Sequence, residues 1–118
     1  MVDDEPDARE LVTRILEHQG AKVTTAESTE DALGILRTSS PDVLVSDIGM
    51  PGTDGYQLIR TIRATEAGDQ RLPALALTAF ARADDRKRAM LAGYQAHLSK
   101  PFDTAEFLLV LASLLHRR

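Results

Sequence analysis

Asp47 is the residue of this chain whose type and position best suit it to chemistry. It comes directly after the apolar run 43–46 and stands before the turn-rich stretch 49–55. In open α/β sheets the carboxyl ends of the strands face the crevice in which ligands bind. A carboxylate at the end of a buried strand therefore predicts a ligand or reaction site around Asp47.

Other polar groups occupy comparable places along the chain. An acidic segment opens the sequence, a hydroxyl follows a second apolar run and a lysine follows a third; these groups are Asp3, Asp4, Glu5, Thr78 and Lys100. Neighbouring carboxylates repel one another, and a divalent cation together with an ammonium group would offset that repulsion. The set predicts a site for a divalent cation and a phosphoryl group, with Asp47 as a usable nucleophile.

Length and composition limit the class of protein. The chain has 118 residues, enough for one domain with a single core, and its hydrophobic share of 43% and charged share of 27% are those of globular proteins. The formal net charge of -4 argues against a general nucleic-acid-binding surface, and the absence of cysteine excludes disulfides and thiolate metal sites. Because no apolar stretch is long enough to cross a bilayer and residues 3–5 are acidic, we expect a cytoplasmic domain without membrane contact.

Helical and strand-like periodicities alternate along the chain, which favours a parallel sheet with crossover helices. We expect strands at 22–26, 43–46, 74–77 and 96–98. We expect helices at 6–20, at 28–36, from 54 onward, at 82–92 and at 103–116. Side chains with capping chemistry open three of these helices: Ser28, Asp54 and Asp103. The helix at 82–92 has a thin apolar stripe, so we expect it to be the most loosely held.

Four motifs taken together resemble the receiver domain of two-component response regulators over essentially the whole chain, 1–118. They are Val2–Pro6, Ser46–Gly55, Leu77–Ala79 and Ser99–Phe102. Each motif is weak alone, but their order and their places after strands make the set specific. The resemblance implies one flavodoxin-like α/β domain, with five helices and a doubly wound parallel sheet of five strands in the order 2-1-3-4-5.

The resemblance also implies the metal site and the acceptor. Asp47 would be the phosphoacceptor, which attacks the phosphoryl group carried by a histidine of a partner kinase. Asp3 and Asp4 would bind Mg²⁺, Asp4 more directly and Asp3 partly through water. Asp47 and the backbone carbonyl of Gly49 would complete this oxygen-rich magnesium site.

The phosphoryl oxygens would be held by Lys100 and Thr78, helped by the backbone N–H groups of Gly49 and Ala79. His97 occupies the position where the family usually has a larger aromatic side chain that swings inward when Thr78 moves. Histidine can rotate similarly, but it is smaller and titrates near neutral pH. Thr78 and His97 are therefore the expected switch residues, with a purely structural His97 as the alternative.

The first strand that the resemblance implies is largely truncated, since only Met1 and Val2 precede Asp3. About four missing buried side chains at roughly 1.5–3 kcal/mol each amount to roughly 6–12 kcal/mol. That is comparable with the whole stability of a typical domain, about 5–15 kcal/mol. We therefore expect the native gene to encode more apolar residues upstream of Asp3, and the chain as it stands to be unstable, aggregation-prone or completed by strand exchange.

The expected function is that of a receiver, a switch controlled by phosphorylation, and two other classes of function fit the sequence less well. A receiver is a signalling domain that catalyses only its own phosphorylation and dephosphorylation. A phosphohydrolase with an aspartate nucleophile usually has a second acid two residues later, where this chain has Gly49. An interaction module that is never phosphorylated is disfavoured by the intact Asp47, Thr78 and Lys100.

The partners are also predicted only by class. We expect a histidine kinase or a kinase domain fused to the same chain, and no nucleic acid. The segments 76–81 and 96–101 are most similar to receivers of hybrid histidine kinases, with a stand-alone regulator as the other possibility. The last helix has an expected core stripe of Phe107, Val110, Leu111, Leu114 and Leu115. The apolar residues Leu108, Leu109 and Ala112 widen this stripe, which predicts either deeper burial or a contact surface for a dimer or a neighbouring domain.

Overall fold

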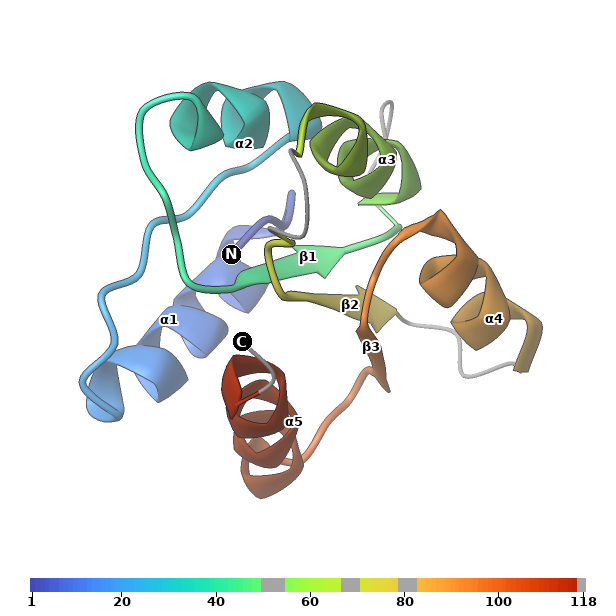
Figure 1. Ribbon diagram of the computed structural model, residues 1–118. Helices are drawn as coiled ribbons and strands as arrows, with labels where there is room; N and C mark the ends of the chain where they lie inside the picture. Colours follow the sequence, from blue (N-terminus) through green and yellow to red (C-terminus); the bar gives the residue numbers. More distant parts are fainter. Residues whose placement is uncertain (50–54, 67–70, 79–82, 117–118) are drawn as a thin grey trace.

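The computed structural model describes residues 1–49, 55–66, 71–78 and 83–116 (Figure 1). Within these ranges five helices and three strands follow one another: α1 Pro6–His18, α2 Thr29–Leu36, β1 Leu44–Asp47, α3 Gly55–Thr65, β2 Ala74–Thr78, α4 Ala83–Ala92, β3 Ala96–Ser99 and α5 Thr104–His116. The strands form a parallel sheet in the order β1-β2-β3. Asp47 pairs with Leu77, and Thr78 pairs with Ser99. The carboxyl ends of all three strands therefore meet at one edge.

Val2 lies where a further strand would lie beside β1. It forms isolated parallel bridges to Ala26 and to Ser46, and its backbone carbonyl accepts a hydrogen bond from Asp47 N at 2.9 Å. The expected strand at 22–26 is wrong as a strand: the segment meets the chain around Val2 through the isolated bridge of Ala26 and through Thr24 O, which accepts from the Met1 N-terminus at 3.0 Å. The order 2-1-3-4-5 with five strands stays a prediction, since the described residues form three.

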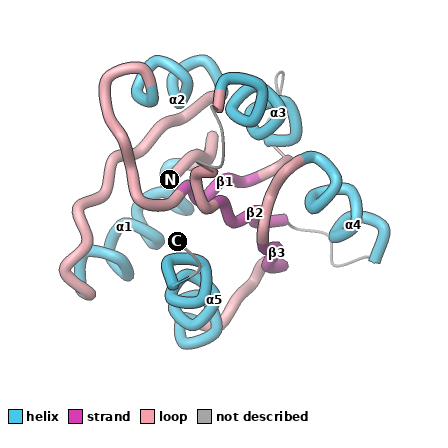
Figure 2. Tube along the Cα trace, viewed as in Figure 1, coloured by secondary structure: helices cyan, strands magenta, loops and turns pink. Residues whose placement is uncertain are grey.

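Helices cover both faces of the sheet (Figures 1 and 2). One core joins Leu44 and Ala76 to residues of α2, α3 and α4, and a second core joins Leu75 and Leu77 to residues of α1 and α5. Successive side chains of a strand point to opposite faces, so a strand covered on both sides must be apolar throughout. This explains why the segments around 43–47 and 74–78 show no alternation of polar and apolar residues.

The helices follow the expected pattern with one correction. Ser28 caps α2 by accepting a hydrogen bond from Asp31 N at 3.1 Å, whereas the expected cap Asp54 lies outside the described residues. In α5, Phe107, Leu111 and Leu114 are buried, but Leu115, also expected in the core, is 41% exposed. Adjacent residues of a helix differ by about 100° in direction, so Leu114 and Leu115 cannot both face the sheet. None of the helices in the described ranges is long and apolar enough to cross a membrane.

Candidate functional site

Three carboxylates meet at the carboxyl edge of the sheet. Asp3, Asp4 and Asp47 each place one oxygen within 4.8 Å of the others. Asp47 ends β1, and the pairing of Val2 with β1 brings the acidic segment to the same edge. Asp3 is fully buried, Asp47 is nearly buried and Asp4 is exposed. Two of the three negative charges are thus largely withdrawn from water. Burying a charge in this way costs free energy unless the charge is paired.

Lys100 supplies a positive charge to this cluster. Its Nζ lies 3.1 Å from Asp3 Oδ2 and 3.4 Å from Asp47 Oδ1. The backbone N–H of Lys100 donates to Thr78 O at 2.7 Å, which fixes the lysine directly after β3. The Lys100–Pro101 peptide bond is cis. The Lys100 ammonium therefore pairs with two buried acids that lie on different segments of the chain.

The ionisation of Asp47 and Lys100 reflects this crowding. Burial raises the pKa of Asp47, the nearby Lys100 ammonium works against that rise, and the Asp3 charge adds to it. Burial alone would lower the pKa of Lys100, but the charges of Asp47 and Asp3 outweigh it and the pKa is raised. Lys100 is thus held as a cation. A further positive charge near Asp47 would stabilise its ionised form.

The remaining candidate residues differ in how close to Asp47 they lie. Thr78 ends β2 at the same edge and is 3% exposed. Gly49 N lies 3.4 Å from Asp47 Oδ1, at the long end of the hydrogen-bond range, and a Cβ on Gly49 would lie 4.0 Å from that oxygen. No side chain at position 49 therefore covers the carboxylate. Ala79 lies outside the described residues.

His97 lies on β3 and is half-buried. It pairs with Ala76, two residues before Thr78, which pairs with Ser99. In a parallel pair, residues in register share a face, so Thr78 and His97 lie on the same face of neighbouring strands. The placement is compatible with the expected switch, whose operation stays a prediction.

The donor set of this cluster fits Mg²⁺. Carboxylate and carbonyl oxygens are the ligands that this hard dication prefers, and a second positive charge suits a site with three acids and one ammonium. Asp3 already accepts from Glu5 N at 3.0 Å through Oδ1 and from Lys100 Nζ at 3.1 Å through Oδ2. Asp4 and Asp47 are therefore the acids with more capacity for direct metal binding.

Two contacts of the site were not predicted from the sequence. Arg9 Nη1, from α1, donates to Asp3 O at 2.7 Å and ties the acidic segment to the helix that follows it. Gly55, the first residue of α3, packs so closely on Asp47 that a Cβ there would lie 2.7 Å from Asp47 O. A glycine directly after a turn-rich stretch could have indicated such a close backbone approach.

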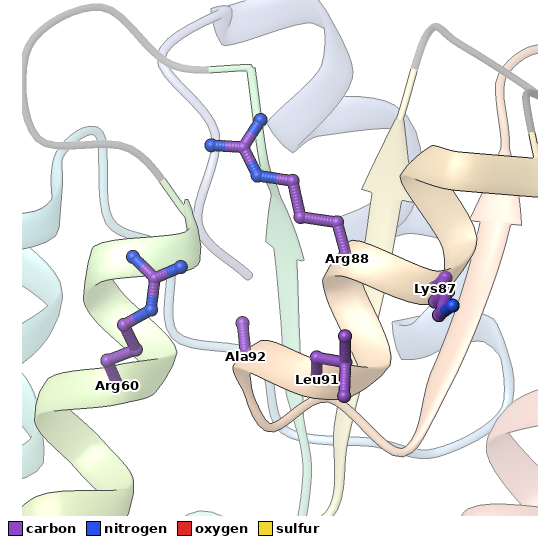
Figure 3. Close-up of a pocket in the computed structure, with 5 residues that line it drawn as sticks. All are labelled: Arg60, Lys87, Arg88, Leu91 and Ala92. Atoms are coloured by element: carbon purple, nitrogen blue, oxygen red, sulfur yellow. The ribbon is translucent and has the colours of Figure 1, made fainter.

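A pocket between α3 and α4 has a different character. Its lining consists of Arg60, Lys87, Arg88, Leu91 and Ala92, with Arg60 on α3 and the others on α4 (Figure 3). Arg88 also stacks over the ring of Tyr56 at 4.3 Å. The lining is basic and apolar and holds no carboxylate, so it offers no oxygen ligands for a metal.

Comparison with known proteins identifies the family of the chain. The family model for the response regulator receiver domain matches residues 1–112. Response regulator Rre1 of Synechocystis is 40% identical over 100% of the chain, which spans 51% of that protein, or about half its length. A putative response regulator from Chloroflexus aurantiacus is 32% identical with a TM-score of 0.90, covering 98% of this chain and 93% of that one. The receiver domain of a signal transduction histidine kinase from Syntrophus aciditrophicus is 28% identical with a TM-score of 0.85, covering 98% and 86%. The resemblance is confirmed: the chain belongs to the response regulator receiver domain family, the phosphoacceptor domains of two-component signalling.

Proposed function

We propose that Asp47 accepts a phosphoryl group from a phosphohistidine of a kinase, in a reaction that requires Mg²⁺. The observation that carries this proposal is the placement of Asp47: a nearly buried carboxylate at the end of β1, 3.4 Å from the Lys100 ammonium and grouped with Asp3 and Asp4. Phosphoryl transfer needs positioning and charge stabilisation more than covalent machinery. The cluster offers both.

In the proposed step an Oδ of Asp47 attacks phosphorus. An O–P bond forms, the P–N bond to the donor histidine breaks, and the histidine nitrogen keeps the electron pair and takes up a proton. Lys100 and the Thr78 hydroxyl bind the phosphoryl oxygens and offset their charge. Hydrolysis of the acyl phosphate returns phosphate and the free Asp47 carboxylate.

The metal would be held by Asp4, Asp47 and the carbonyl of Gly49, with Asp3 acting partly through water. When bound, Mg²⁺ supplies charge neutralisation between the acids and the phosphoryl oxygens. The three acids otherwise repel the incoming phosphoryl group as well as one another. The metal dependence follows from this charge balance.

The metal requirement gives the first prediction. Incubation with acetyl phosphate and Mg²⁺ should add one phosphoryl group to the chain, and excess EDTA should abolish the adduct in intact-mass spectra. Adding calcium instead of magnesium to the chelated sample is the matched control for a non-specific effect of a dication. Circular dichroism checks that chelation leaves the fold intact. Equal adduct formation with and without EDTA would contradict the metal dependence.

The switch gives the second prediction. If His97 follows Thr78, binding of beryllofluoride as a phosphoryl mimic should shift the His97 ring resonances, and the shift should depend on pH across the neutral range. His18, exposed at the end of α1, serves as the internal control. Unchanged His97 resonances under every condition would leave it a structural residue.

The wider context of the chain is proposed at the level of class. Receivers of response regulators interact with histidine kinases, and the likeness to a histidine kinase receiver supports a hybrid kinase as the parent, with a stand-alone regulator as the alternative. On α5, Leu109 is 72% exposed, which fits a dimer contact better than deeper burial. The segments around Val2 and Ala26 are proposed to occupy the remaining two places of a five-stranded sheet.

A further inference from the structure

Tyr94 lies outside the carboxylate cluster and is linked to the backbone of Asp47 through Gly55. It lies in the turn between α4 and β3 and is 2% exposed. Its hydroxyl donates to the carbonyl of Gly55 at 2.7 Å, a buried hydrogen bond between residues 39 positions apart. Gly55 is the first residue of α3. The Tyr94 side chain, from the connection between α4 and β3, thus holds the start of α3, the helix that follows Asp47.

Gly55 in turn presses on the backbone that carries the acceptor. A Cβ built on Gly55 would lie 2.7 Å from Asp47 O, 2.7 Å from Ile48 Cα and 2.8 Å from Ile48 Cγ2. Such distances are far below ordinary carbon contacts, so nothing separates the start of α3 from the segment Asp47–Ile48. A displacement of Gly55 toward the sheet must move Asp47, and a displacement away removes its support.

The turn that carries Tyr94 is itself firmly anchored. Tyr94 N donates to Ala89 O at 3.1 Å, and Arg63 Nε donates to Gly93 O at 3.0 Å. Arg63 belongs to the last turn of α3, so the turn holds α3 at both ends. From the same turn the chain continues along β3 to Lys100. One short segment therefore locates both the start of α3 and the ammonium that faces Asp47.

We propose that the Tyr94 hydroxyl is a positioning group for phosphoryl transfer. It fixes the first turn of α3 against the Asp47 backbone and so holds the carboxylate at its 3.4 Å separation from Lys100 Nζ. The inference rests on the proposed function of Asp47. Misplacement of a reacting group by about 1 Å costs on the order of 100-fold in rate. Loss of one hydrogen bond allows a smaller displacement, so the expected loss is about tenfold.

The test compares Tyr94→Phe with a variant that loosens the same helix elsewhere. At saturating acetyl phosphate and Mg²⁺, Tyr94→Phe should take up the phosphoryl group about tenfold more slowly, with little change in the acetyl phosphate concentration that gives half the maximal rate. Tyr94→Leu, which also lacks the hydroxyl, should be slowed at least as much. Ile62→Val removes a methyl group from the buried face of α3 without touching Gly55 and should retain the wild-type rate.

A merely structural Tyr94 predicts a different pattern. Melting curves establish a temperature at which every variant is folded, and at that temperature a Tyr94→Phe rate equal to that of Ile62→Val overturns the proposal. The backbone amide shifts of Ile48 and Gly49 give an independent readout, and unchanged shifts in Tyr94→Phe overturn it as well. A wild-type protein that takes up no phosphoryl group would instead refute the function proposed for Asp47, and the amide shifts would still decide the role of Tyr94.

Discussion

Asp47→Asn should reduce phosphoryl uptake from acetyl phosphate to the background level, the largest effect of any single change at the site. Asparagine keeps the shape of the side chain but replaces the nucleophilic carboxylate with an amide, which cannot form a stable acyl phosphate. Removing this charge also relieves part of the repulsion around Asp3, so the fold should persist with the Lys100–Asp3 contact at 3.1 Å intact. The measurement is the intact mass after incubation with acetyl phosphate and Mg²⁺.

Asp42→Asn is the matched control for that experiment. Asp42 is exposed and precedes β1, so it lies at the amino end of the strand that carries Asp47 at its carboxyl end. The control variant should take up the same single phosphoryl group as the wild type. A phosphoryl adduct of equal yield on Asp47→Asn would show that another residue is the acceptor.

Phe107→Ala should lower the free energy of unfolding by about 3–5 kcal/mol, the range for large-to-small changes of a buried aromatic side chain. Phe107 is 0% exposed, lies in the core between α5 and the sheet, and stacks on Phe102 with ring centroids 5.0 Å apart. The loss is comparable with the whole stability of many domains, so the variant should be partly unfolded at room temperature. Urea titration followed by circular dichroism measures it.

Leu109→Ala on the same helix separates burial from helix propensity. Leu109 is 72% exposed, so its truncation should change the free energy of unfolding by no more than about 0.5 kcal/mol. Equal urea midpoints for the two variants would mean that Phe107 does not lie in the core. A large loss at Leu109 would instead indicate that this side chain is covered by another copy or domain in solution.

The sequence predicted the central elements well because their physical signals are local. β1 and β2 are short apolar runs, and each extends one residue past its apolar part, to Asp47 and to Thr78. Backbone pairing depends on the neighbouring strand and not on the side chain, so a polar residue at the end can remain in the ladder. The acids and the lysine were expected together because the carboxyl ends of parallel strands share an edge.

The features that the sequence did not predict depend on contacts between distant segments. The segment 22–26 looked like a strand from its alternation, but Ala26 forms only an isolated bridge to Val2. The hydrogen bond from Tyr94 joins the connection between α4 and β3 to Gly55 at the start of α3, and no local pattern indicates it. Such contacts follow from the packing of complete helices. The periodicity of a single segment does not predict that packing.

The contact between Lys100 and Asp3 also affects when the site forms during folding and synthesis. Its two atoms belong to residues 97 positions apart, nearly the full length of the chain. Contacts of high sequence separation are slow to form, because the entropy of closing the intervening loop is lost before the contact stabilises the chain. A nascent chain that ends before β3 would carry Asp47 and both N-terminal acids but no ammonium between them. Under the proposed role of Lys100, we expect competence for phosphorylation to begin only after synthesis has passed this residue.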